Sequence, residues 1–228
     1  MIILHIETST HICSVAVSIG QKCIFSRQNT DGMNHAALLS VFIEEAFNHL
    51  KSLKKRIDAV AVSSGPGSYT GLRIGVSTAK GLCYGLNVPL IQVSTLETMT
   101  LEAIQQLEDI RPDMFFVPMI DARRMEVYSA LYDRNLKLIH ETQAEIITDK
   151  SYSELLQKNK LVFFGNGATK CMPLISSKNA VFLDDVHPLA INMIKPASAK
   201  MEAGEFEDVA YFEPFYLKEF FTTARISG

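Results

Sequence analysis

The chain has 228 residues, of which 47% are hydrophobic and 21% are charged, and it lacks tryptophan. This length can bury one large core or two small ones, and the ordinary composition excludes a fibrous or disordered chain. A formal net charge of −3 disfavours a nucleic-acid-binding protein that works without a partner.

The amino terminus and the cysteines indicate a cytoplasmic protein. The first apolar run stops at Glu7, with neither a basic flank nor a cleavage site, so it predicts a strand rather than a signal peptide. No apolar run is long enough to span a membrane. The cysteines show no C-x-x-C pair and no metal-ligand spacing, which indicates reduced thiols: Cys13, Cys23, Cys83 and Cys171.

The first half of the chain predicts the order β-β-β-α-β-α-β-α. The expected strands are residues 2–6, 14–19, 22–27, 57–63 and 89–93, and the expected helices are residues 34–50, 70–86 and 94–107. Gly20 and Gln21 predict a two-residue hairpin turn, whose register places Cys23 opposite Ser18 and leaves the cysteines of the hairpin unpaired.

A glycine-rich turn joins the fourth strand to the second helix. Gly65 and Gly67 allow positive φ, while Ser68 and Thr70 are both suitable N-caps. Backbone N–H groups and a helix N-terminus at one point suit an anion, so these four residues are candidates for cofactor binding. The spacing matches neither common nucleotide-binding glycine motif, and a turn without a ligand is at least as good an interpretation.

The second helix carries two glycine rows beside its apolar stripe. Gly71, Gly75 and Ala79 form one row, and Gly81 and Gly85 form the other. Each interior glycine costs roughly 1 kcal/mol of helix propensity relative to alanine, so a compensating contact is needed. We expect close approach of another helix or strand, either within this chain or on a partner.

The second half repeats the layout of the first after a break at Pro112. The expected strands are residues 114–120, 126–132, 136–146, 161–164 and 181–183, and the expected helices are residues 152–159, a helix opened by residues 165–167, and residues 188–202 broken at Pro196. This duplication predicts two α/β lobes with a waist near residues 107–113. The expected domains are residues 1–108 and 109–228, with the last segment as a candidate to pack back on the first lobe.

Two charged clusters stand out in an otherwise mixed sequence. Lys51, Lys54, Lys55 and Arg56 follow the end of the first helix, where cations complement the helix dipole, and we interpret them as a solvated helix end. An acidic cluster lies over residues 202–213 and further weakens the case for a free-standing RNA site.

Three segments together carry a family resemblance that covers nearly the whole chain. They are Ile6–Thr10, Gly65–Gly75, and Ile120–Arg123 with Glu126–Tyr128. In this order and spacing the chain resembles the TsaB family of bacterial threonylcarbamoyl-adenosine biosynthesis proteins, which are glycoprotease-like paralogues of TsaD. The resemblance implies a duplicated actin-like ATPase fold, which is ribonuclease H-like and has two lobes.

The resemblance also implies that the chemistry of the fold is lost. TsaD binds a metal through a His-x-x-x-His pair, whereas His35 here is followed four residues later by Leu39. We therefore expect no metal site and interpret His35 as a solvent-facing residue at a helix start.

The phosphate-binding turns of the wider fold contain glycine, and this chain lacks glycine at both corresponding places. They are Glu7–Thr10 and Asp121–Arg124. Asp121 is a candidate lone carboxylate for a cation, but we expect it rather to cap a strand end or to pair with an arginine. Gly165–Gly167 resembles the adenosine-side turn of the fold.

We therefore expect a non-catalytic partner subunit required for threonylcarbamoyl transfer to the adenosine next to the tRNA anticodon. It would bind and activate a TsaD-like catalytic subunit, with a TsaE-like ATPase in the same complex. The lone chain would need no cofactor and would form a homodimer, whereas ATP and a metal would sit on partner subunits and tRNA would be met only through the complex.

The expected docking surface lies on the first two helices, because Leu38 and Val41 widen the apolar sector beyond one core face. The expected partner-binding residues are His35, Leu38, Val41, Phe42, Gly71, Gly75, Thr78 and Ala79. The alternative function is an actin-like-fold small-molecule kinase or metallopeptidase, which titration with ATP–magnesium would reveal.

Overall fold

The structure is a computed structural model that describes residues 1–32 and 34–217. The first series of elements is β1 (Ile2–Glu7), β2 (Cys13–Ile19), β3 (Lys22–Asn29), α1 (His35–Ser52), β4 (Ala59–Gly65), α2 (Tyr69–Leu86), β5 (Leu90–Ser94) and α3 (Thr95–Gln105). The second series is β6 (Met114–Asp121), β7 (Glu126–Asp133), β8 (Leu138–Ile146), α4 (Ser153–Lys158), β9 (Lys160–Phe164), α5 (Ala168–Cys171), β10 (Ala180–Leu183), the 3-10 helix η1 (Ala190–Met193) and α6 (Ile194–Ala203). The predicted order therefore occurs twice.

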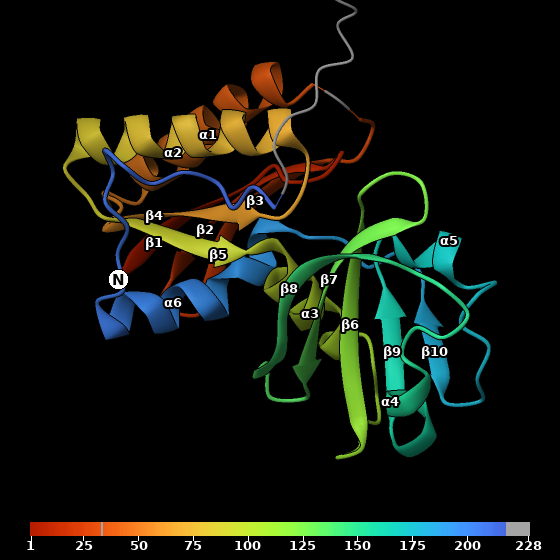
Figure 1. Cartoon of the computed structure of the whole chain (residues 1–228). Coiled ribbons are helices and arrows are strands. Elements are labelled where there is room, and N and C mark those ends of the chain that lie inside the picture. Colours follow the sequence, from red (N-terminus) through yellow and green to blue (C-terminus); the bar gives the residue numbers. More distant parts are fainter. Residues whose placement is uncertain (33, 218–228) are drawn as a thin grey trace, which may run out of the picture.

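Two five-stranded sheets of identical topology form two lobes (Figure 1). The first has the order β3-β2-β1-β4-β5 and the second the corresponding order β8-β7-β6-β9-β10. In each sheet the first three strands are antiparallel, the fourth pairs in parallel with the first, and the fifth pairs in parallel with the fourth. This duplicated mixed sheet is the topology of the actin-like ATPase fold, so the predicted fold class is confirmed.

The first sheet is covered by helices on both faces (Figure 1). Side chains of α1 and α2 pack on one face in a cluster that includes Leu39, Ala46 and Val76. The opposite face packs against Met193 of η1 and Ala197 of α6. Among the described helices, none combines the length and the apolar composition needed to cross a bilayer.

The last helix of each series packs on the sheet of the other series. Leu96, Met99 and Ala103 of α3 share a core cluster with β6, β7 and β9. In the opposite direction, η1 and α6 from the second series cover the face formed by β1, β4 and β5. Figure 1 shows α3 between the two sheets and α6 beneath the first one.

Local chain geometry confirms one prediction and corrects another. Ser18 pairs with Cys23 across the hairpin turn, as the register predicts, and all four cysteines are free. The predicted break at Pro196 is wrong, because α6 runs without interruption over Ile194–Ala203. Pro196 lies in the first turn of α6, where its missing N–H would have no partner within the helix.

Residues 205–217, which we call the C-terminal strap, run along the first lobe. Glu207 forms an antiparallel bridge with Leu90 at the edge of β5. Lys80 of α2 donates hydrogen bonds to two strap carbonyl groups, at 3.0 and 3.1 Å. The Phe215 N–H donates to the Ser64 carbonyl at 2.7 Å, so the strap ends beside the glycine-rich turn.

Candidate functional site

Parallel pairing brings together the loops in which the sequence places its candidates. β1 lies beside β4 in the first lobe, and β6 lies beside β9 in the second. The carboxyl ends of parallel neighbours meet at one edge of a sheet, which is where open α/β sheets bind ligands. The loop after β1 thus meets the glycine-rich turn, and the loop after β6 meets Gly165–Gly167.

The glycine-rich turn is filled by the end of β1. A Cβ atom at Gly67 would overlap the carbonyl oxygen of Ser9, and one at Gly71 would overlap the carbonyl oxygen of Thr8. A Cβ atom at Gly75 would overlap the hydroxyl of Thr8. These glycines are needed because the chain itself approaches them, so part of the space that a phosphate would take is occupied.

Hydrogen bonds within the turn use donors that an anion would need. Ser68 N–H donates to the Ser9 carbonyl at 2.6 Å, and the Thr8 hydroxyl donates to the Gly71 carbonyl at 2.8 Å. The Ser68 hydroxyl caps α2 by accepting from Gly71 N–H at 3.2 Å, so Ser68 is the N-cap. Cofactor binding by Gly65, Gly67, Ser68 and Thr70 stays a prediction that this geometry does not favour.

Several predicted docking residues on α2 belong to the core of this chain. Gly71, Gly75 and Ala79 are buried, so of the two neighbours expected for this row, one within the chain or one on a partner, the internal one is present and these residues are not exposed for docking. The physical reason is the close approach of Thr8, which satisfies the compensating contact within the chain. The row of Gly81 and Gly85 is the exposed one, and a Cβ atom at either position would meet open space.

The other predicted docking residues also fall into a buried group and a group that reaches the surface. Phe42 is buried and His35 is only 8% exposed, with its Nε2 3.2 Å from the Ile12 carbonyl. The expectation that His35 faces solvent is therefore wrong. Val41 is 45% exposed, while Leu38 and, on α2, Thr78 are half-buried. These three residues remain available for a surface contact.

Glu7 stands where the fold family places a phosphate-loop aspartate, but its carboxyl is fully buried. Desolvation raises its pKa, and the hydrogen bond from Ser9 N–H offsets this only in part. Oε1 accepts from Ser9 N–H at 2.6 Å, whereas Oε2 has no hydrogen-bond partner among the described residues. A buried carboxyl of this kind is neutral more readily than an ordinary one, and it does not face a solvent-borne cation.

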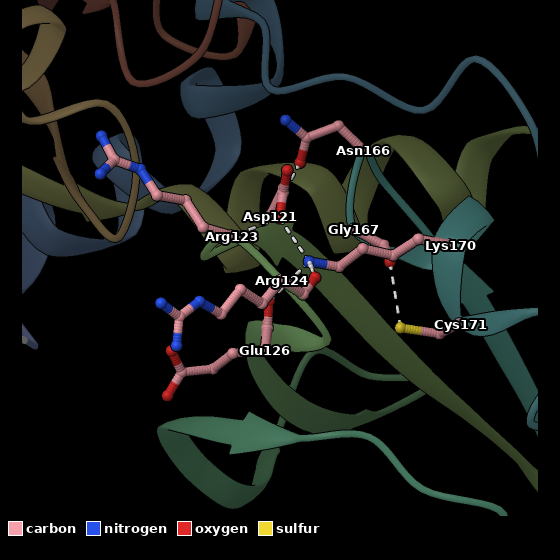
Figure 2. A network of polar contacts seen from close by, with 8 residues as sticks. All are labelled: Asp121, Arg123, Arg124, Glu126, Asn166, Gly167, Lys170 and Cys171. Atoms are coloured by element: carbon pink, nitrogen blue, oxygen red, sulfur yellow. Dashed lines mark hydrogen bonds and ion pairs between the residues drawn. The ribbon is translucent and has the colours of Figure 1, made fainter.

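Lys170 organises the corresponding loop of the second lobe. Its ammonium donates to the Asp121 carboxylate and, at 2.7 Å each, to the carbonyl oxygens of Arg124 and Glu126 (Figure 2). Arg123 N–H donates to Asp121 at 2.8 Å, so Asp121 caps the strand end as expected. Its salt-bridge partner is Lys170 rather than an arginine.

The charge of Lys170 fixes both the electrostatics and the shape of this loop. Partial burial alone would raise the pKa of Asp121, but hydrogen bonds from Lys170 and Arg123 N–H and the charges of both residues hold it below its ordinary value. Arg123 and Arg124 have φ angles of 75° and 50°, which non-glycine residues rarely adopt. In Figure 2 both arginine side chains point away from the lysine.

The adenosine-side turn is packed against β6. Gly165 has φ 94°, and a Cβ atom there would overlap Met99 and the Met119 carbonyl. The Asn166 side chain accepts from Asp121 N–H at 2.9 Å. Beside it, between Thr10, His11, Met99, Asn166, Val186, His187 and Pro188, lies a cavity of about 10 Å³. Such a volume holds one water molecule and is far below that of a small-molecule site.

Sequence reasoning missed two features of this region. Lys170 lies 49 residues from Asp121, and a single lysine in a short helix gives no signal of its partner. The last segment is a candidate to pack back on the first lobe, but the sequence does not reveal its contact with the turn, where Tyr216 packs on Tyr69 with ring centroids 5.0 Å apart and Arg73 lies over Tyr69. No group of His, Cys, Asp and Glu suited to a metal ion occurs among the described residues.

Comparison with known proteins gives consistent matches. A family model described as TsaD, tRNA N6-adenosine threonylcarbamoyltransferase, matches residues 29–189. The tRNA threonylcarbamoyladenosine biosynthesis protein TsaB of Escherichia coli K12 is 29% identical over 235 residues, covering 100% of this chain and 99% of that protein. TsaB of Buchnera aphidicola subsp. Schizaphis graminum is 30% identical and covers 74% of this chain and 80% of that protein.

A solved structure shows the same fold over almost its whole length. It is a Pseudomonas aeruginosa protein described as similar to the peptidase YeaZ, with a TM-score of 0.82 and 22% identity, covering 95% of this chain and 99% of that one. Sequence and fold agree from end to end, and the chain therefore belongs to the TsaB family of tRNA threonylcarbamoyladenosine biosynthesis proteins.

Proposed function

We propose that this chain is a non-catalytic subunit that binds and activates a TsaD-like catalytic subunit in threonylcarbamoyl transfer to the adenosine next to the tRNA anticodon. The observation that carries this proposal is the filled phosphate region of the first lobe. Thr8 and Ser9 occupy the glycine-rich turn, and Glu7 is buried beneath it. A chain that closes its own nucleotide loops contributes by association, with ATP and a metal on partner subunits.

A TsaD-like partner is supported by the match to the TsaD family model, because paralogues of one fold can pair through equivalent faces. The same reasoning makes a homodimer the natural state of the chain without its partner. A TsaE-like ATPase completes the proposed cytoplasmic complex, which supplies the only route by which this chain meets tRNA.

The proposed docking surface is the outer face of α1 and α2. It comprises Val41, Leu38, Thr78, Gly81 and Gly85. An exposed helical glycine costs roughly 1 kcal/mol relative to alanine. Neither Gly81 nor Gly85 has a neighbour that a Cβ atom would meet, so packing within the described chain gives no reason for glycine. Close approach of a partner helix supplies one.

The test is reconstitution of threonylcarbamoyl transfer with the TsaD-like and TsaE-like proteins of the same organism. Val41→Glu and Gly81→Leu should each abolish co-elution with the TsaD-like subunit and lower transfer to the level seen without this chain, because they bury a charge or a bulky side chain in the contact. Ser153→Glu, an exposed substitution at the start of α4, is the matched control and should leave both unchanged.

Two results would contradict the proposal. Full transfer by the TsaD-like and TsaE-like proteins alone would show that this chain is not required. Turnover of ATP–magnesium by the isolated chain in calorimetry would instead support the kinase alternative.

A further inference from the structure

Helix α1 ends in a turn with a fixed backbone shape. Lys55 N–H donates to the Leu50 carbonyl and Lys54 N–H donates to the Lys51 carbonyl, each at 3.0 Å. This pair of bonds is the Schellman arrangement, in which the residue after the C-cap takes the left-handed conformation. That residue is Lys54, with φ 54°.

A lysine at this position is unexpected on backbone grounds alone. Helix α2 ends on Asn87 at φ 54° and helix α6 ends on Gly204 at φ 70°, and asparagine and glycine are the residues that tolerate this conformation best. A Cβ atom makes the left-handed conformation strained at Lys54. Strain of this kind persists where the side chain serves another purpose.

The purpose indicated by the surroundings is a concentrated positive charge. Lys51, Lys54, Lys55 and Arg56 are all exposed. None of them takes part in the ion pairs found among residues 1–32 and 34–217. The carboxylate that follows along the chain, Asp58, already accepts from Ile2 N–H at 2.7 Å and pairs with the amino terminus.

We propose that this turn, residues 51–56, is a docking site for the phosphate backbone of RNA. The proposal rests on the proposed function, which makes tRNA the RNA that the complex handles. Four cations on a rigid turn match a row of phosphates, and each cation that neutralises a phosphate contributes through counterion release. A membrane surface fits less well, since lipid insertion needs an apolar face and the turn exposes only Leu53 among apolar side chains.

The experiment measures the affinity of fluorescently labelled tRNA for the assembled complex as a function of KCl concentration. The combined variant Lys51→Ala, Lys54→Gly, Lys55→Ala, Arg56→Ala should flatten the slope of log affinity against log salt by about 0.7 to 0.9 for each phosphate that is no longer neutralised. Lys54→Gly alone should weaken tRNA binding and at the same time raise the melting temperature. A role confined to the helix end predicts only the rise in melting temperature.

Lys158→Ala is the matched control, because Lys158 is an exposed lysine in the last turn of α4. An unchanged salt slope in the combined variant overturns the proposal. The proposal is also overturned if the combined variant binds tRNA like wild type but loses binding to phosphatidylserine vesicles, because the turn would then be a membrane-binding site. Co-elution with the TsaD-like subunit is measured on the same samples. If wild-type chains do not co-elute, the proposed function fails, and the salt slope of the lone chain with tRNA then decides whether the turn binds RNA.

Discussion

The two lobes share one topology, but they hold their strand-end loops by different physical means. The loop after β1 is fixed by close packing, with Thr8 against Gly71 and Gly75 and a buried Glu7 carboxyl. The loop after β6 is fixed by charge, through the ammonium of Lys170. Duplication thus preserved a backbone plan without preserving the interactions that stabilise it.

The first-lobe loop should be the more sensitive to added volume, which gives the largest expected effect. Gly71→Ala places a Cβ atom on the Thr8 carbonyl, a backbone atom that cannot rotate away, and should lower the free energy of unfolding by about 3 kcal/mol. Gly81→Ala on the same helix should raise it by up to about 1 kcal/mol, because its Cβ meets open space. Urea unfolding gives the free energy of unfolding of each variant relative to wild type. A change in the same direction for both variants would contradict the packing account.

Removal of the lysine tests the second-lobe loop. Lys170→Met keeps most of the volume but deletes three hydrogen bonds from a charged donor, and should cost about 2 kcal/mol. Amide exchange should quicken at Arg123 and Arg124 and stay unchanged at Ser9. Spread of the effect to Ser9 would show that the two loops are not held independently.

The pH dependence of the first-lobe loop follows from Glu7. Its pKa in the folded state is raised, so its contribution to stability is complete below the ordinary value of 4.5 and is lost as pH rises through the folded-state pKa. Glu7→Gln removes this loss and should stabilise the protein relative to wild type by about 1 kcal/mol at neutral pH, the scale of one buried hydrogen bond. Denaturant midpoints from pH 4 to about 8 give the measurement, and a constant difference across that range would contradict it.

The second-lobe loop should respond to pH in the opposite direction and more weakly. The pKa of Asp121 is lowered, so its contribution is present above the ordinary value of 3.8 and is lost as pH falls through the folded-state pKa. Asp121→Asn should therefore destabilise at neutral pH and approach wild type in acid. The effect should be small because the Asp121 side chain is 46% exposed. Urea midpoints of both proteins at acid and neutral pH provide the comparison.

The sheets were predictable because their strands are short apolar runs separated by glycine, proline or polar turns. Which face of α2 is buried within this chain was not predictable. Gly71 and Gly75 lie on the same side as Leu72 and Val76, but a glycine row indicates close approach without saying whether the neighbour is internal. Thr8, the neighbour in question, is polar and lies 63 residues from Gly71, and no local pattern joins them.

The ion pair of the second lobe, between Lys170 and Asp121, was equally hard to predict from the sequence. Asp121 was recognisable as a strand-end carboxylate, but the sequence offers many lysines and gives no register between β6 and α5. The burial of His35 was equally hidden, because its partner, the Ile12 carbonyl, lies 23 residues away and no local pattern joins the two.

The exchange of α3 and α6 between the sheets has a consequence for synthesis on the ribosome. One face of the first sheet is covered by Met193 and Ala197 of the second series. The residues of this face are Ile3, Ala59, Ala61, Ile91 and Val93. Met193 and Ala197 leave the ribosome only after the whole second sheet has been made. The nascent first half therefore carries an uncovered apolar face while the second sheet is being made, and the apolar side chains of α3 at its end stay unpacked until β6, β7 and β9 have formed. The two halves must mature together, and neither is a self-sufficient folding unit despite the symmetry of their plan.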